Sequence, residues 1–502
     1  MKAYRTIIDT TGRTSLLLAG VLLAGIVLRI YDLGTESLWI DEAISMLWAK
    51  QSPSHIMARA ALDVHPPLYF VILHYWINLF GDSEFSARLL SAIIGIISIF
   101  MIFKVGSLIF GSDVGLLSAF IMATSVFHIW YSQDARAYSL LVLMSLLSIF
   151  FFIQLYRRKS RRDSIGYIVF SCLLIYTHYF GFFIIIAQNI FYCTLFFLTK
   201  EKNDMGIKRW VLLQGLLIIS YLPWGGKLIK QLLTIGRGET DTLSWITMPS
   251  FYTPIDSLKT YAGSLELMSL FLTFAVFAII SYKKNYSKGE VYFSNVTSMY
   301  LLALWLAIPV ILPVILSYIF KPIYETRYTI SASLALYILA AKGIQNTNNR
   351  FVKYAVIIVI AALSLTNAKH YYDRIDKQQW REAITYVGES AKTGDKIIFL
   401  PGGPFNAQIW DYYSQRKDVI KEPFVLKGND KDNINNVKTA VAGYDRIWFI
   451  VSGGKDFKDI FQEVLQQSSY HLLLDRRYDG MSALPEWAII QVILYERQDT
   501  GA

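Results

Sequence analysis

Apolar segments recur throughout the first 370 residues, separated by short polar gaps. Each is long enough, or nearly long enough, to cross a bilayer as a helix. They lie at 15–31, 88–109, 114–130, 138–156, 164–178, 181–198, 210–228, 259–281, 296–320, 327–342 and 352–369. The stretch 67–80 is also apolar, but it has only about fourteen residues and contains two polar side chains, His74 and Asn78. The pattern therefore predicts about eleven transmembrane helices, with a further helix along the membrane interface.

Composition and charge agree with a polytopic membrane protein. The 502 residues are 54% hydrophobic and 15% aromatic, which exceeds what a soluble core of this size needs. The formal charge of +10 comes mainly from short gaps between apolar segments, including 157–162, 208–209 and 283–284, and forms no basic stripe for nucleic acid. If 67–80 does not cross the membrane, these clusters share the side of the N-terminus, which should be cytoplasmic.

Two other features of the membrane region have ordinary explanations. Lys2, Arg5 and Arg13 precede the first apolar segment, as in a signal peptide, but no cleavage site follows, so we expect a retained helix. Cys172 and Cys193 lie within apolar segments without metal-ligand spacing. We interpret them as small packed residues that form neither a disulfide framework nor a zinc site.

The periodicity changes near residue 371, which divides the chain into a membrane domain, 1–370, and a second domain, 371–502. The second domain lacks a GxGxxG motif and a P-loop, and we expect a small α/β fold on the extracytoplasmic side. Acceptor recognition and a lid over the membrane site are the two roles considered for it. Helices are predicted at 380–390, 407–414 and 456–467, and extended segments at 395–400, 446–451, 470–475 and 487–495.

Polar clusters interrupt the membrane domain at four places, 41–42, 65–67, 131–138 and 324–328. The predicted topology puts all four on the extracytoplasmic side, which suggests one shared pocket. A positioned carboxylate is needed to deprotonate a weak nucleophile such as a sugar hydroxyl, and Asp41 is the natural candidate. A phosphate group needs fixed positive charge. Candidates to supply it are Arg88, Arg136, Arg327 and a protonated His65.

The order of these motifs resembles the GT-C membrane glycosyltransferases. Trp39-x-Asp41-Glu42-Ala43, His65-Pro66-Pro67-Leu68, Ser86-Ala87-Arg88-Leu89, Tyr131-Ser132-Gln133-Asp134-Ala135-Arg136-x-Tyr138 and Arg327-Tyr328 follow one another in the chain. The likeness spans roughly residues 15–345 and is nearest to the branch related to protein O-mannosyltransferases and lipid A aminoarabinose transferases. It implies a GT-C fold and an inverting transfer of a hexose or pentose from a polyprenyl monophosphate to a glycan, lipid or protein hydroxyl, at the outer face of the cell membrane.

The resemblance also implies residue roles. Asp41 matches the essential first-loop carboxylate, the proposed base, and Glu42 matches its partner. His65 stands where the aminoarabinose branch has a phosphate-binding lysine. Arg136 falls near an acidic position that binds metal in that branch. An arginine at this position argues against the metal site of that branch. Asp134 lies two residues away, so the question of a bound divalent cation stays open. The candidate substrate-binding set is His65, Arg88, Asp134, Arg136, Tyr138 and Arg327.

Plainer interpretations stay open at this point. The acidic pair also suits the start of a helix on a solvated loop, and Arg88 and Arg136 could snorkel to the interface. Arg327 could simply pair with Glu325. The turn at 176–179 is more typical of an aromatic belt than of an acceptor site. For the whole chain the alternatives are a transporter of lipid-linked sugars and an inactive scaffold. The ionisable residues gather at one face without an internal repeat, which favours the enzyme.

Overall fold

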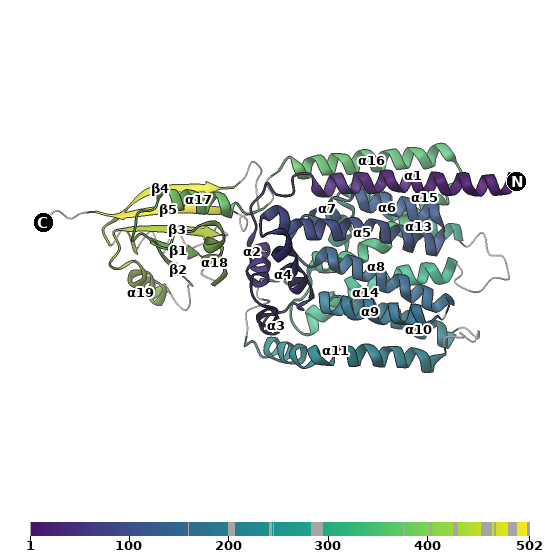
Figure 1. Ribbon diagram of the computed structural model, residues 1–502, viewed down its shortest axis with the longest axis horizontal. Helices are drawn as coiled ribbons and strands as arrows, with labels where there is room; N and C mark the ends of the chain where they lie inside the picture. Colours follow the sequence, from purple (N-terminus) through teal and green to yellow (C-terminus); the bar gives the residue numbers. More distant parts are fainter. Residues whose placement is uncertain are drawn as a thin grey trace. The chain divides into compact units, whose positions relative to one another are not determined.

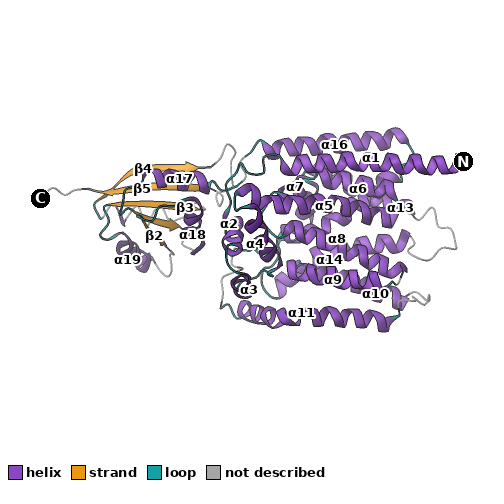
Figure 2. Cartoon of the chain, viewed as in Figure 1, coloured by secondary structure: helices purple, strands orange, loops and turns teal. Residues whose placement is uncertain are grey.

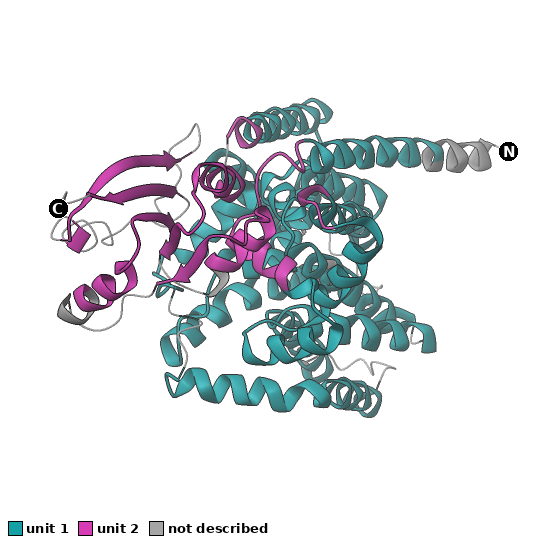
Figure 3. Ribbon diagram, turned by 60° about the vertical axis from the view of Figure 1, so that its left-hand side comes forward, with its two compact units in different colours: residues 1–31, 48–81, 86–369 teal, residues 32–47, 82–85, 370–502 magenta. Residues whose placement is uncertain are grey.

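The computed structural model describes residues 2–158, 160–198, 206–239, 243, 245–282, 295–374, 377–400, 404–424, 430–452, 464–465, 468–479 and 489–498. The chain forms two compact units (Figure 3). Unit 1 contains residues 1–31, 48–81 and 86–369, and unit 2 contains 32–47, 82–85 and 370–502. The loop that carries the acidic pair and the start of the helix that carries Arg88 are thus grouped with the C-terminal residues.

Unit 1 is helical throughout its described regular structure (Figures 1 and 2). Its helices are α1 (Lys2–Ile30), α3 (Pro53–Leu62), α4 (Leu68–Phe80), α5 (Glu84–Phe110, of which the first two residues belong to unit 2), α6 (Ser112–Thr124), α7 (Val126–Ser132), α8 (Tyr138–Arg158), α9 (Arg161–Thr177), α10 (Gly181–Leu198), α11 (Ile207–Gly236), α12 (Thr253–Ala262), α13 (Leu265–Tyr282), α14 (Asn295–Ile319), α15 (Ile330–Gln345) and α16 (Arg350–Tyr372, of which the last three residues belong to unit 2). A short 3-10 helix, Thr326–Thr329, precedes α15. Neighbours such as α8 and α9, or α13 and α15, pack along their lengths.

The polytopic membrane character is confirmed, but the count of eleven spans is not. Six described helices, α1, α5, α8, α11, α14 and α16, are long and apolar enough to cross a bilayer. Two bent pairs raise the number to eight: α6 with α7, at 64°, and α12 with α13, at 98°. The segments 164–178, 181–198 and 327–342, which were also expected to cross, form the shorter helices α9, α10 and α15. Helix α4, with 13 residues, is too short to span, in agreement with the sequence.

A buried arginine stabilises the bend between α6 and α7. The Arg29 guanidinium, on α1, donates to the carbonyl oxygens of Met122 (3.1 Å) and Ala123 (3.0 Å), in the last turn of α6, and to Ser132 Oγ (3.1 Å), at the end of α7. Carbonyls at a helix end have no partner within the helix, and lipid offers none. A permanent positive charge at a helix C-terminus also interacts favourably with the helix dipole. The bend leads directly into the segment from Gln133 to Tyr138.

Unit 2 contains a five-stranded mixed sheet, so the predicted α/β fold of the C-terminal region is confirmed. The elements are α2 (Ile40–Ala49, of which the last two residues belong to unit 1), α17 (Trp380–Ser390), β1 (Lys396–Leu400), α18 (Pro404–Tyr413), β2 (Ile420–Pro423), α19 (Asp430–Val441), β3 (Arg446–Ser452), β4 (Tyr470–Tyr478) and β5 (Ile490–Arg497). The strand order is β2-β1-β3-β5-β4. Strand β1 is parallel to β2 and β3, whereas β5 is antiparallel to β3 and β4.

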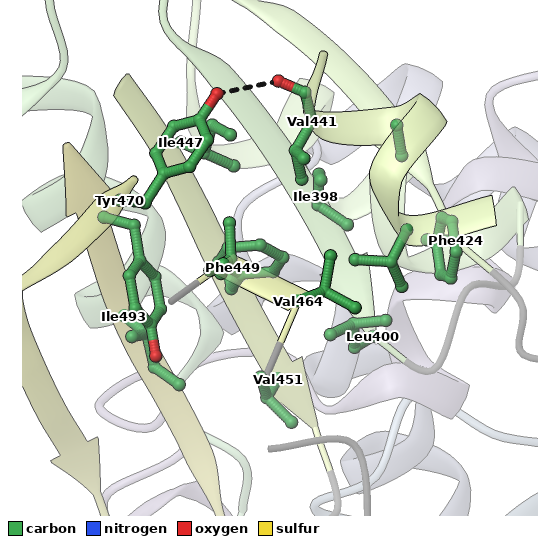
Figure 4. Close-up of a cluster of buried hydrophobic side chains, with 14 residues drawn as sticks. Ile398, Leu400, Phe424, Val441, Ile447, Phe449, Val451, Val464, Tyr470 and Ile493 are labelled. Atoms are coloured by element: carbon green, nitrogen blue, oxygen red, sulfur yellow. Dashed lines mark hydrogen bonds between the residues drawn. The ribbon is translucent and has the colours of Figure 1, made fainter. Parts of the chain in front are cut away.

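Strand alternation builds the core of this sheet. Ile398 and Phe449 point to one face, where they pack with Val437 of α19 and with Val464 (Figure 4). The Tyr470 hydroxyl donates to the Val441 carbonyl (2.9 Å), which ties the start of β4 to the end of α19. The sequence pattern did not predict β2 or α19. Apart from residues 464–465, the expected helix at 456–467 lies outside the described residues.

Candidate active site

Three side chains from different parts of unit 1 form a hydrogen-bonded chain. His65 lies just before α4, and its Nδ1 is 2.7 Å from Asp63 Oδ1. Its Nε2 is 3.1 Å from Nη2 of Arg136, in the turn between α7 and α8. The structure therefore brings together His65 and Arg136, two predicted site residues that are 71 positions apart. Asp63 was not among the predicted residues.

The hydrogen-bond chemistry fixes the tautomer of His65. A guanidinium can only donate, so Nε2 must accept from Arg136, and Nδ1 must carry the proton that it donates to Asp63. His65 is therefore neutral in this arrangement. The expected protonated His65, a positive charge for a phosphate, does not fit these contacts. Here His65 orients Arg136, which is itself buried.

Asp63 is the acidic member of this hydrogen-bonded chain. Burial alone would raise the pKa of Asp63, but its hydrogen bond with His65, the Val64 N–H and the nearby Arg136 charge together lower the pKa below its ordinary value. Asp63 is consequently ionised at neutral pH and holds the His65 Nδ1–H. By accepting the Nδ1 proton, the Asp63 carboxylate leaves the unprotonated Nε2 of His65 facing the Arg136 guanidinium.

An aromatic cluster lies next to these three hydrogen-bonded side chains and contains residues of two other predicted segments, 131–138 and 324–328. His178 follows α9, and its ring lies 6.3 Å from the ring of His65 and 4.9 Å from that of Tyr328. The Tyr328 ring stacks on Tyr138 at 6.3 Å. Burial, together with the nearby charges of Arg136 and Arg327, holds the pKa of His178 well below its usual range. His178 Nδ1 accepts from the backbone N–H of Phe180 (3.2 Å), which suits a neutral ring.

Arg327, Asp134 and Arg88 have different surroundings. Arg327 adjoins Tyr328, and its guanidinium stacks over the ring of Trp245, with 5.0 Å to the centroid. Asp134 is buried, and its carbonyl accepts from the backbone N–H of Arg136 (2.7 Å). Arg88 is buried on α5. Ser91, one turn further along α5, donates to the Arg136 carbonyl (3.4 Å). Burial makes the snorkelling interpretation of Arg88 and Arg136 unsuitable.

A largely apolar cavity of about 510 Å³ opens beside His65. Its size is typical of ligand pockets. Most of its lining comes from α10, α11, α14 and the segments that directly follow α9, α11 and α14. Only His65, His178, Tyr179, Gln231 and Tyr328 bring polar side-chain atoms to its described wall. Because His178 and Tyr179 line this cavity, the aromatic-belt interpretation does not hold for them. Their signal in the sequence was a histidine between two tyrosines at a predicted turn.

The acidic pair lies in unit 2, at the start of α2, and its two members have different surroundings. Glu42 is completely buried, and its Oε1 is 3.0 Å from Nζ of the buried Lys377. Asp41 is half-buried, in the first turn of the helix. Within the described residues, no group of three or more His, Cys, Asp or Glu side chains is placed to hold a metal ion.

Comparisons with known proteins identify the fold. Residues 64–224, about a third of the chain, match the family described as dolichyl-phosphate-mannose-protein mannosyltransferase. No curated protein matches the sequence significantly. Among solved structures, ArnT from Cupriavidus metallidurans bound to undecaprenyl phosphate superimposes with a TM-score of 0.60 at 11% identity, over 96% of this chain and 98% of that one.

A second similar structure comes from an archaeon. The Archaeoglobus fulgidus oligosaccharyltransferase in complex with Zn and sulfate gives a TM-score of 0.56 at 12% identity, over 86% of this chain and 67% of that one. The apo form of ArnT gives 0.57 at 10% identity, over 97% of this chain and 98% of that one. Together with the family match, these likenesses confirm the resemblance that the motifs indicate: the chain has the fold of the GT-C glycosyltransferases that use polyprenyl-phosphate sugars.

Proposed function

We propose that this multi-pass membrane protein is a glycosyltransferase that moves a sugar from a polyprenyl monophosphate to an acceptor hydroxyl, with inversion. The observation that carries the proposal is the junction at His65, which both lines the apolar cavity and contacts Arg136. A lipid-linked sugar phosphate has the matching chemistry, because a prenyl chain suits apolar walls and a phosphate suits a guanidinium. The family match and the fold point to the same reaction class.

In the proposed reaction, the acceptor oxygen bonds to the anomeric carbon as the bond from that carbon to the phosphate oxygen breaks. The hydroxyl proton passes to Asp41, and the departing phosphate keeps the bonding electron pair. Arg136 stabilises the growing negative charge, and we assign Arg88, Arg327 and Tyr138 to the surrounding donor site. Lipid phosphate is already a fair leaving group, so alignment of the acceptor carries much of the catalysis. We place this site on the extracytoplasmic face, because the basic clusters mark the opposite one.

The proposal is tested with purified protein in lipid nanodiscs and a panel of polyprenyl-phosphate hexoses and pentoses. We expect release of polyprenyl phosphate with at least one donor when acceptor glycans, lipids or peptides are present. The anomeric configuration of the product should be opposite to that of the donor. Movement of an intact donor across liposomes without release would instead identify a transporter. If no donor is turned over and none is moved, the proposal is wrong.

Asp63 should matter through His65, although it touches no substrate in this scheme. Asp63→Asn keeps the shape and removes the charge that fixes the His65 proton. Losing a hydrogen bond to a charged group costs about 1.5–3 kcal/mol, so kcat/KM should fall roughly 10- to 100-fold. The matched control Asp113→Asn, an exposed carboxylate on α6, should leave kcat/KM unchanged.

The pH dependence follows from the lowered pKa of Asp63. A carboxylate with a lowered folded-state pKa contributes fully above its unfolded pKa, near 4, and its contribution is lost as pH falls through the lower folded value. The ratio of wild-type to Asp63→Asn activity should therefore be constant from about pH 6 to 8. A ratio that changes across this range, or equal activity of the two proteins, would contradict the role of Asp63.

A further inference from the structure

The loop that carries the acidic pair folds as part of unit 2. Ser37 Oγ donates to the Gln378 carbonyl (2.5 Å), and the Ile40 N–H donates to Gln378 Oε1 (3.1 Å). The Leu38 N–H donates to the Tyr413 hydroxyl (2.7 Å), on α18. Each contact joins residues more than 330 positions apart. The C-terminal residues thus supply the hydrogen-bond partners for the backbone leading into α2.

Gln378 connects this loop to the sheet. Its Oε1 also accepts from Trp380 Nε1 (3.0 Å), and its Nε2 donates to Ser452 Oγ (3.0 Å), at the end of β3. Gln378 is buried, so these contacts replace water. The loop is consequently held against an ordered part of the domain, and its backbone has little freedom to shift while Gln378 stays in place.

Glu42 is held from both sides of its carboxylate. Oε1 pairs with Lys377 Nζ at 3.0 Å, and Oε2 accepts from the Trp39 N–H at 3.3 Å. The side chains of Lys377 and Glu42 are 5% and 0% exposed. A buried charge that loses its partner is strongly unfavourable, whereas a pair replaced by neutral groups often is not. This asymmetry lets a structural role of Glu42 be separated from a chemical one.

Asp41 differs from its neighbour in position. Consecutive residues on an α-helix lie about 100° apart, so Asp41 and Glu42 cannot both face Lys377. The Asp41 carbonyl accepts from Ser45 Oγ (3.0 Å), as expected in a regular first turn. Holding the Glu42 side chain in place therefore also fixes the direction in which the Asp41 side chain projects from α2.

We propose that Glu42 is a positioning residue, and that the C-terminal domain, through Lys377 and Gln378, holds the loop so that Asp41 has the geometry of a proton acceptor. This inference rests on the proposed function. It gives the C-terminal domain a defined task, which differs from acceptor recognition and from a lid. It also separates the roles of two adjacent carboxylates that the family resemblance treats as partners.

The test uses the full chain and compares Lys377→Met, Glu42→Gln and the double variant. Lys377→Met leaves a buried carboxylate without its ammonium, so the loop shifts and kcat should fall on the order of 100-fold. The Kd for polyprenyl phosphate should stay within about twofold of wild type, because the phosphate site is assigned to unit 1. In the double variant, the new amide oxygen at position 42 still accepts from the Trp39 N–H and no charge is buried, so kcat should return to within about tenfold of wild type.

The outcomes separate the two roles of Glu42. If it takes part in the chemistry, the double variant will be as inactive as Asp41→Asn, and the inference is overturned. Unchanged activity of Lys377→Met would overturn it too. The control Lys421→Gln, which removes a surface ion pair with Asp411 in the same domain, should behave as wild type.

Thermal unfolding provides a readout that does not depend on turnover. Lys377→Met should lower the unfolding temperature, and the added Glu42→Gln change should restore it. If the wild-type protein turns over no donor, the proposed function fails, while this restoration still tests the ion pair. If neither restoration nor rescue of activity occurs, the positioning role is wrong regardless of the reaction.

Discussion

Asp41→Asn is expected to abolish sugar transfer and leave donor binding intact. The amide has the shape of the carboxylate but cannot accept the acceptor's proton at neutral pH. General-base catalysis contributes about 10²- to 10⁴-fold, and we expect kcat to fall on the order of 1,000-fold. The Kd for the donor should change less than about threefold, because Asp41 is not assigned to the phosphate. Release of polyprenyl phosphate measures kcat, and titration with a non-transferable donor analogue measures Kd.

The matched control lies in the same loop. Asp32 is exposed and has a φ of 62°, a conformation that Asn also tolerates. Asp32→Asn should therefore retain wild-type turnover. If Asp41→Asn kept more than a tenth of the wild-type kcat, Asp41 would not be the group that accepts the proton of the acceptor hydroxyl. If Asp32→Asn lost activity equally, the effect would reflect the loop as a whole.

Arg136→Ala should be the second most damaging change. This guanidinium is buried, is oriented by His65 and is assigned to the departing phosphate. Removing one preorganised donor from such a site costs about 2.7–4 kcal/mol, which corresponds to roughly a 10²- to 10³-fold loss in kcat. Donor affinity should also fall, because the same charge binds the ground-state phosphate. Arg136→Lys keeps the charge but loses the planar fork, so its kcat should be intermediate.

The control for Arg136 is Arg59→Ala, an exposed arginine on α3 that should leave both constants unchanged. An Arg136→Ala protein with weaker donor binding but normal kcat would restrict Arg136 to ground-state binding. Wild-type values for both constants would remove it from the site. Because Arg136→Ala also leaves His65 Nε2 without its donor, Asp63→Asn in this background should add little further loss.

The sequence predicted the features that depend on composition over many residues. Apolar periodicity located the long helices of the membrane region, and the short apolar runs at 395–400 and 446–451 indicated strands of the sheet. The clusters at His65 and Arg136 were recognised because ionisable residues are costly in a bilayer. Bends such as α6–α7 were missed, since they depend on Arg29, a residue nearly 100 positions away.

Other features depend on which segments meet in space. Asp63 stands two residues before His65, but only the contact between their side chains gives it a role. The contrast between Asp41 and Glu42 depends on Lys377, which lies 335 positions further along the chain than Glu42. His178 resembles an aromatic-belt residue until the segment with Tyr328 folds against it. The neutral state of His65 likewise follows only from its two partners.

The distance in sequence between Glu42 and Lys377 has a consequence for biogenesis. Ribosomes add about 5–20 residues per second, so about 17–67 s separate the synthesis of the two residues. During that interval Glu42 lacks its ion-pair partner, because Lys377 has not yet been made. If the proposed roles are correct, a newly made chain cannot transfer sugar until the segment that contains Lys377 has been synthesised and has folded against the loop before α2.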